Sequence, residues 1–197
     1  MPRSRIVRGA LGGVTLWLAA CGSNEHPVDA GCGPLGDTPS AEAGTGSFAF
    51  EPMPDVLPVF INTSQSDPYL QVHVRIHGIP PGNPGDAFDP SNPKTTMTVV
   101  LASLGLTLGP GPGHPSSLGY VCSPASNAYD MIHSIKVGFG FGSTIPIDQV
   151  SGKQARITIG VVGSDGASAT DEKLVTLTVA SAAAPGAGAP LTIDRAP

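Results

Sequence analysis

The feature that most constrains the fold of this chain is a series of short runs in which apolar and polar residues alternate. Clusters of glycine and proline separate these runs. Of its 197 residues, 26 are glycine and 21 are proline. No long window carries apolar residues at the spacing of an amphipathic helix, and the best helical candidate is the short segment 126–132. The pattern therefore predicts an all-β fold with frequent turns.

Seven runs have the composition or the alternation of β-strands. Residues 69–77 alternate most regularly, because even-numbered positions from 70 on are apolar and odd-numbered ones are polar. Such alternation predicts one buried face and one solvated face. The predicted strands are residues 47–51, 56–63, 69–77, 95–103, 132–141, 155–163 and 173–180, and their number favours a single antiparallel β-sandwich.

The last predicted hairpin resembles a known type of domain. Its sequence, ITIGVVGSDGASATDEKLVTLTV (157–179), contains an alternating strand, an S-D-G turn and a returning Thr/Val strand. It is similar to the closing hairpin of bacterial Ig-like and fibronectin III-like domains. The resemblance implies an Ig-like architecture for a sandwich that we expect to span residues 47–180.

The amino-terminal segment has the same order of regions as a secretory signal peptide: basic residues, then an apolar stretch, then a cleavage site. Arg3, Arg5 and Arg8 precede an apolar stretch over residues 9–18, which is about half the length of a bilayer-spanning helix. The stretch ends in LAAC (18–21), which resembles the lipobox of bacterial lipoproteins. This resemblance implies cleavage after residue 20 and acylation of the new amino-terminal cysteine. The alternative is an ordinary signal peptide with a cysteine beside the cleavage site.

Acylation of Cys21 would make the membrane the first partner of this chain, because two or three acyl chains on one residue anchor stably. Lipoproteins retained at the inner membrane usually carry aspartate after the cysteine, whereas this chain has Gly22. The resemblance thus implies a location at the outer membrane of the bacterial cell envelope. The predicted segments are a signal peptide (1–20), a lipidated flexible tether (21–46), the β-sandwich (47–180) and a low-complexity tail (181–197).

Two other cysteines are predicted to form a disulfide. With lipid on Cys21, the remaining thiols are Cys32 and Cys122. An oxidising compartment outside the cytosol favours their pairing. The bond would pin the base of the tether onto the sandwich.

His73 and His77 lie on one face of a predicted strand, which raises the question of whether they share a metal ion. Residues four apart on a strand are separated by about 13 Å, which is too far for two ligands of one zinc ion. We therefore assign both to the solvated face of the sheet, or to a polar contact patch. The sequence GFGFG (138–142) lacks the following helix that a dinucleotide site requires.

Asp86, Asp89 and Asn92 gather in the predicted loop GDAFDPSNP (85–93). Calcium takes six to eight oxygen ligands, which acidic loops can supply. The spacing here matches no calcium loop, and clusters of Asp, Asn and Pro also build turns. We predict a turn and no metal site, and keep calcium as the alternative.

The net charge and the motifs of the chain reduce the number of function classes that it fits. Residues 1–20 hold three of the ten basic residues and none of the fifteen acidic ones, which leaves a mature formal charge of −8. This chain has no basic footprint for nucleic acid. No nucleophile motif, catalytic triad or carboxylate pair indicates an enzyme, and no motif indicates a cofactor.

We therefore predict a non-catalytic binding or structural module of the cell envelope. Its contact residues are expected in the loops 79–94 and 105–119, which are the longest and richest in glycine and proline. The expected partner beyond the membrane is an envelope protein or a polysaccharide. The alternatives are a calcium- or ligand-dependent module that uses the 85–93 loop, and an enzyme without a recognised signature.

Overall fold

A computed structural model describes residues 32, 38–61, 68–109, 115–139 and 147–179. These residues form strands and two short 3₁₀ turns, Ala102–Leu104 and Ile147–Gln149, and they contain no α-helix. The all-β prediction is confirmed. The strands are β1 (Ser40–Thr45), β2 (Glu51–Pro52), β3 (Val56–Ile61), β4 (Pro68–His77), β5 (Lys94–Leu101), β6 (Leu106–Leu108), β7 (Tyr120–Ser123), β8 (Ala128–Met131), β9 (Ile135–Gly138), β10 (Gln154–Val162) and β11 (Ser168–Val179).

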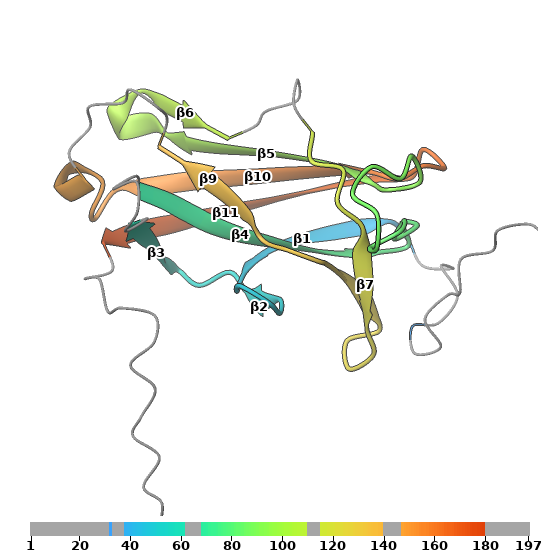
Figure 1. The fold of residues 1–197 in the computed structure, drawn as a ribbon. Coiled ribbons are helices and arrows are strands. Elements are labelled where there is room, and N and C mark those ends of the chain that lie inside the picture. The colour runs from blue at the N-terminus through green and yellow to red at the C-terminus, as the bar shows by residue number, and fades with distance from the viewer. Residues whose placement is uncertain (1–31, 33–37, 62–67, 110–114, 140–146, 180–197) are drawn as a thin grey trace, which may run out of the picture.

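Backbone hydrogen bonds join these eleven strands into one mixed, open sheet (Figure 1). The main path runs β2-β1-β4-β3-β11-β10-β5-β6, while β8 and β9 pair with β4 and β7 pairs with β8. All pairs are antiparallel except β3 with β11, which are parallel over Val56–Val59 and Thr176–Val179. The sheet thus has more strands than the seven predicted, and it is not purely antiparallel.

The hairpin of β10 and β11 forms where the sequence predicts it. Its strands pair from Gln154–Thr176 to Val162–Ser168. Gly166 adopts a φ of +85°, a left-handed conformation that glycine reaches without strain. The Asp165 carboxylate accepts the backbone N–H of Ala167 at 2.9 Å, which closes the turn.

One apolar cluster forms the core, and β4 crosses it. All four even-numbered apolar residues of β4, namely Leu70, Val72, Val74 and Ile76, are fully buried, as predicted. In β11, Val175 and Leu177 are buried and Val179 is half-buried. Alternation therefore identifies the inner face of these strands correctly.

The strands missed by the sequence pattern are short or small-residue segments. β1 (SAEAGT) lies inside the predicted tether 21–46, so the β-structure begins before residue 47. Ala43 is nevertheless fully buried, because its small side chain fits where β1 approaches β11 and its N–H donates to Asp171 Oδ2 at 2.8 Å. Residues 126–132, the helical candidate, instead complete a turn and form β8.

Residues 79–93, here called the Asx loop, follow β4 and lie beside the start of β7. The Tyr120 N–H donates to Pro81 O at 2.9 Å. Gly163 in the β10–β11 hairpin is also close, since a Cβ added there would lie 2.9 Å from Ile79 Cγ2. The Asx loop, the β10–β11 turn and the beginning of β7 thus gather at one end of the molecule, on the right in Figure 1.

Candidate functional site

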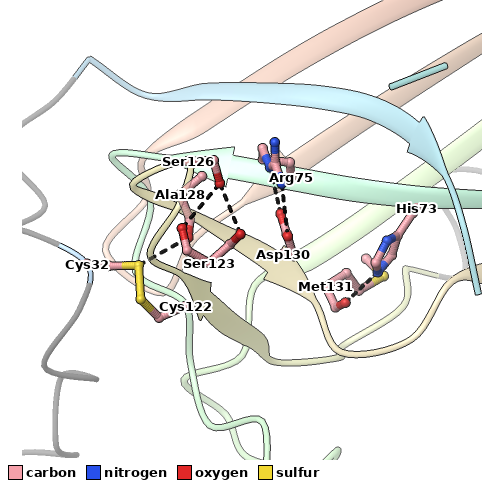
Figure 2. Close-up of polar contacts among 9 residues, drawn as sticks. All are labelled: Cys32, His73, Arg75, Cys122, Ser123, Ser126, Ala128, Asp130 and Met131. Atoms are coloured by element: carbon pink, nitrogen blue, oxygen red, sulfur yellow. Dashed lines mark hydrogen bonds and ion pairs between the residues drawn. A yellow bond between two sulfur atoms is a disulfide. The ribbon is translucent and has the colours of Figure 1, made fainter. Parts of the chain in front are cut away.

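Cys32 and Cys122 form a disulfide, as predicted. Their sulfur atoms are 2.02 Å apart and their Cα atoms 5.7 Å apart, across a sequence separation of 90 residues. Cys122 lies in β7, and Cys32 is only 6% exposed. Cys32 Sγ lies 3.2 Å from the carbonyl oxygen of Ala128, at the start of β8 (Figure 2). The bond fixes the chain ahead of β1 onto the β7–β8 hairpin.

The turn between β7 and β8 is held by its own serines. Ser126 donates its N–H to Ser123 O at 3.1 Å, and its hydroxyl lies 3.0 Å from Ser123 Oγ (Figure 2). Asn127 completes the turn with a φ of +48°, a conformation that asparagine tolerates better than most residues. Cys122 therefore sits on a hairpin closed by local hydrogen bonds.

Arg75 and Asp130 form an ion pair between β4 and β8. Arg75 Nε donates to Asp130 Oδ1 at 2.6 Å, and Nη2 donates to Oδ2 at 3.0 Å (Figure 2). The two side chains are only 17% and 10% exposed. The hydrogen bond to Asp130 raises the pKa of Arg75, against the opposing effect of burial. The Phe50 ring covers the guanidinium, with 4.1 Å between its centroid and Arg75 Cζ.

His73 was predicted on a solvated face, and this prediction is wrong because its side chain is completely buried. The β1–β2 hairpin brings Phe50 against β4, where the Phe50 and His73 ring centroids are 6.1 Å apart. His73 Nε2 lies 2.6 Å from Met131 O (Figure 2). A carbonyl oxygen only accepts, so Nε2 carries the proton, and Nδ1 is left without a hydrogen-bond partner among the described residues. His77 is half-buried.

The name Phe50 cluster is used here for Phe50, His73, Arg75 and Asp130. In this cluster the Phe50 ring helps to cover polar side chains on β4. The charges within it neutralise one another, and its histidine nitrogen is tied to a backbone carbonyl. Across the described ranges, no group of three or more His, Cys, Asp or Glu side chains is placed to hold a metal ion. Sequence reasoning missed this cluster, because Phe50 and Asp130 reach β4 from distant segments.

The Asx loop uses the side chains of the calcium candidates to bind its own backbone. Asp86 Oδ1 accepts the Phe88 N–H and Asp89 Oδ1 accepts the Ser91 N–H, both at 2.9 Å. Asn92 Oδ1 accepts the Asn83 N–H at 2.6 Å. The Asp86 and Asp89 contacts each span two residues and are Asx turns, while the Asn92 contact closes the loop across nine residues, so the loop is braced without a metal.

Asn92 also ties the Asx loop to the rest of the fold. It is 3% exposed, and its Nδ2 donates to Asp86 O at 2.7 Å and to Ser117 O at 3.1 Å. The loop nevertheless holds Phe88 in solvent, with 94% of that residue exposed. A lone aromatic inside a run of turn formers was the available sequence signal for Phe88.

The comparisons with known proteins return nothing. Neither a family model, nor a curated protein, nor a solved structure matches this chain. Its function therefore has to be inferred from its own residues.

Some predicted features lie outside the described residues. They include Cys21, the segment before it, and part of the 105–119 loop. In the part of the chain that is described, no helix is long and apolar enough to cross a membrane. What the described residues do provide is a braced loop with an exposed aromatic, next to a disulfide that fixes the chain's entry into the fold.

Proposed function

We propose that this chain is a cell-envelope lipoprotein, acylated on Cys21, whose β-domain is a non-catalytic binding or structural module. The observation that carries the proposal is the Cys32–Cys122 disulfide. Structural disulfides persist in oxidising compartments and are rare in the cytosol. The leader ending in LAAC (18–21) supports export to such a compartment and the addition of lipid there.

An Ig-like sandwich is the proposed architecture of the domain, with the sheet divided into two facing layers. Ig-like domains place strands A, B, E and D in one layer and C, F and G in the other. The pairing order β1-β4-β8-β7 corresponds to A-B-E-D, and β5-β10-β11 corresponds to C-F-G, with every strand in the matching chain order. β3 would then connect the layers, since it pairs with β11 and with β4. This agreement in order supports the proposal.

A binding role without a metal is favoured over the calcium-dependent alternative. Asp86, Asp89 and Asn92 each direct a side-chain oxygen to a backbone N–H of the Asx loop. A calcium ion would have to compete with these hydrogen bonds for its ligands. The Asx loop is already braced as it stands, and it projects an aromatic side chain rather than a ring of carboxylates.

Lipid labelling tests the proposed function. The full chain is expressed with a secretion-competent leader in a bacterial host and labelled with radioactive palmitate. We expect label on the parent chain and on the matched control Cys32→Ser, and none on Cys21→Ala. Processing of the parent should be blocked by globomycin, which inhibits the lipoprotein signal peptidase. Palmitate incorporation that persists in Cys21→Ala would refute acylation at this residue.

A further inference from the structure

The chain enters the β-domain at the end that carries the Asx loop. Ser40, the first residue of β1, pairs with His77, the last residue of β4, directly before that loop. The disulfide adds a second attachment at the same end, because Cys122 follows Tyr120, whose N–H bonds to Pro81 of the Asx loop. Cys32, through which any preceding chain joins the fold, therefore lies at this end of the molecule.

The reach of that anchor is short. Cys32 comes eleven positions after Cys21, and a fully extended chain of this length spans at most about 40 Å. This step rests on the proposed acylation of Cys21. With lipid at that position, Cys32 stays within about 40 Å of the membrane surface, so this end of the β-domain can bring the Asx loop into contact with it.

The Asx loop exposes one aromatic side chain, and hydrogen bonds within the loop hold the backbone that carries it. Phe88 is 94% exposed, while its own N–H is held by Asp86 Oδ1 at 2.9 Å. Asn83 Nδ2 donates to Asp89 Oδ2 at 2.9 Å, and Asn92 anchors the loop base. Binding through a braced loop loses little conformational entropy, which favours association.

We propose that Phe88 inserts into the lipid surface that holds Cys21, as a second and non-covalent membrane contact. A phenyl ring has no polar group to satisfy, so the interfacial acyl region suits it better than water. The Asx loop contains no lysine or arginine, and Asp86 and Asp89 flank the ring. The driving force for insertion is therefore apolar rather than electrostatic, so insertion occurs on zwitterionic lipid. The two carboxylates limit its depth to the headgroup region.

Two equally exposed phenylalanines allow a matched test. Phe48 is also 94% exposed, but it follows the far end of β1, since Ser40 pairs with His77 beside the Asx loop and Gly44 pairs with His73 farther along β4. The chain's only tryptophan, Trp17, belongs to the proposed signal peptide. Acylated Phe88→Trp and Phe48→Trp proteins would thus each carry one tryptophan, and both substitutions are at solvent-exposed positions that folding tolerates.

The experiment reconstitutes each acylated variant in phosphatidylcholine vesicles, with and without brominated acyl chains, and records flotation and tryptophan emission. Phe88→Trp should show blue-shifted emission that brominated lipid quenches and that added salt leaves unchanged. Phe48→Trp should emit as in water, without quenching. If Phe88→Trp floats with the vesicles but its tryptophan emission is not quenched, the membrane contact is overturned while the lipid anchor stands. The Asx loop would then be a contact site for an envelope protein or a polysaccharide. Failure of both variants to float would overturn the anchor and this contact with it.

Discussion

Arg75 and Asp130 form a two-point ion pair that is largely withdrawn from water. Removing one partner of such a pair leaves the other charge buried without compensation, which costs more than the intact pair contributes. We expect Asp130→Asn to lower the free energy of unfolding by about 3 kcal/mol, the low end for a buried pair because both side chains keep some contact with water. Urea denaturation of the full chain in detergent would measure this loss.

The matched control is the exposed pair of Arg156 and Glu172. Their nearest atoms are 3.5 Å apart, and the side chains are 60% and 56% exposed. Exposed pairs contribute little because water and salt screen them, so Glu172→Gln should change stability by less than about 0.5 kcal/mol. If Asp130→Asn and Glu172→Gln lowered the free energy of unfolding equally, burial would not distinguish the two ion pairs and the prediction would be wrong.

Tyr120 gives a prediction at alkaline pH. It is 1% exposed and its hydroxyl lies 2.7 Å from Thr95 Oγ1. Burial raises the pKa of Tyr120 above its ordinary value of 10.0, although the hydrogen bond to Thr95 partly opposes this. Above pH 10 the unfolded chain releases a proton that the folded chain keeps, so the free energy of unfolding falls as pH rises.

Tyr120→Phe removes this ionisation together with one hydrogen bond. At neutral pH the variant should be less stable than the parent by about 1 kcal/mol. Above pH 10 the gap should narrow, because only the parent loses stability through Tyr120, while Tyr69 and Tyr129 are present in both proteins. Urea titrations from pH 8 to pH 11 would test this, and a gap that stays constant would contradict it.

At the scale of elements, the Asx loop depends on a side chain that no strand pattern identifies. Asn92 accepts from Asn83 and donates to Asp86 and Ser117. Asn92→Ala should lower the free energy of unfolding by about 2 kcal/mol, since buried backbone groups lose their partners. Amide hydrogen exchange should accelerate across the loop in this variant but not in β10 or β11.

Calcium should leave the same loop unaffected. The side-chain oxygens of Asp86 and Asp89 already accept hydrogen bonds from their own loop. We expect the thermal unfolding midpoint to be the same with millimolar calcium as with a chelator, with magnesium as the control ion. A calcium-specific rise would show that the loop exchanges these bonds for a metal.

Longer strands could be predicted from the sequence because their own residues determine which face is buried. β4 and the β10–β11 hairpin alternate over eight or more residues, so one run contains enough information. β7 (YVCS) and β8 (AYDM) are four residues each, and all of β8 is buried, which leaves no alternation to detect. Short strands of this kind depend on the neighbours with which they pair.

His73 shows the same limit within a strand that was predicted correctly. Alternation places it opposite the core, but cannot indicate that other segments of the chain cover that face. The cover comes from Phe50 in the chain ahead of β3 and from the Met131 carbonyl in β8. Sequence alone predicted the Cys32–Cys122 pair because few cysteines were available, whereas the Phe50 cluster required tertiary contacts.

For the whole molecule, the disulfide should be a large single contribution to stability. It closes a loop with a separation of 90 residues, for which chain entropy predicts about 4–5 kcal/mol, reduced by any strain. We expect this loss in the double variant Cys32→Ser/Cys122→Ser, measured by urea denaturation. Dithiothreitol should shift the parent to the same midpoint and leave the variant unchanged. A parent insensitive to reductant would contradict the assignment.

The disulfide also determines how a pulling force would pass through the molecule. Residues 32–122 form one covalent ring that contains β1 through β6 and the first part of β7. Tension applied between the chain ahead of Cys32 and the chain after β11 crosses from Cys32 directly to Cys122 and bypasses that ring. Within the β-domain, only the chain from Cys122 onward, with β8 to β11, can lengthen under load. A chain pulled from both ends in this way would therefore gain no length from its first six strands, even after β8 to β11 had unfolded.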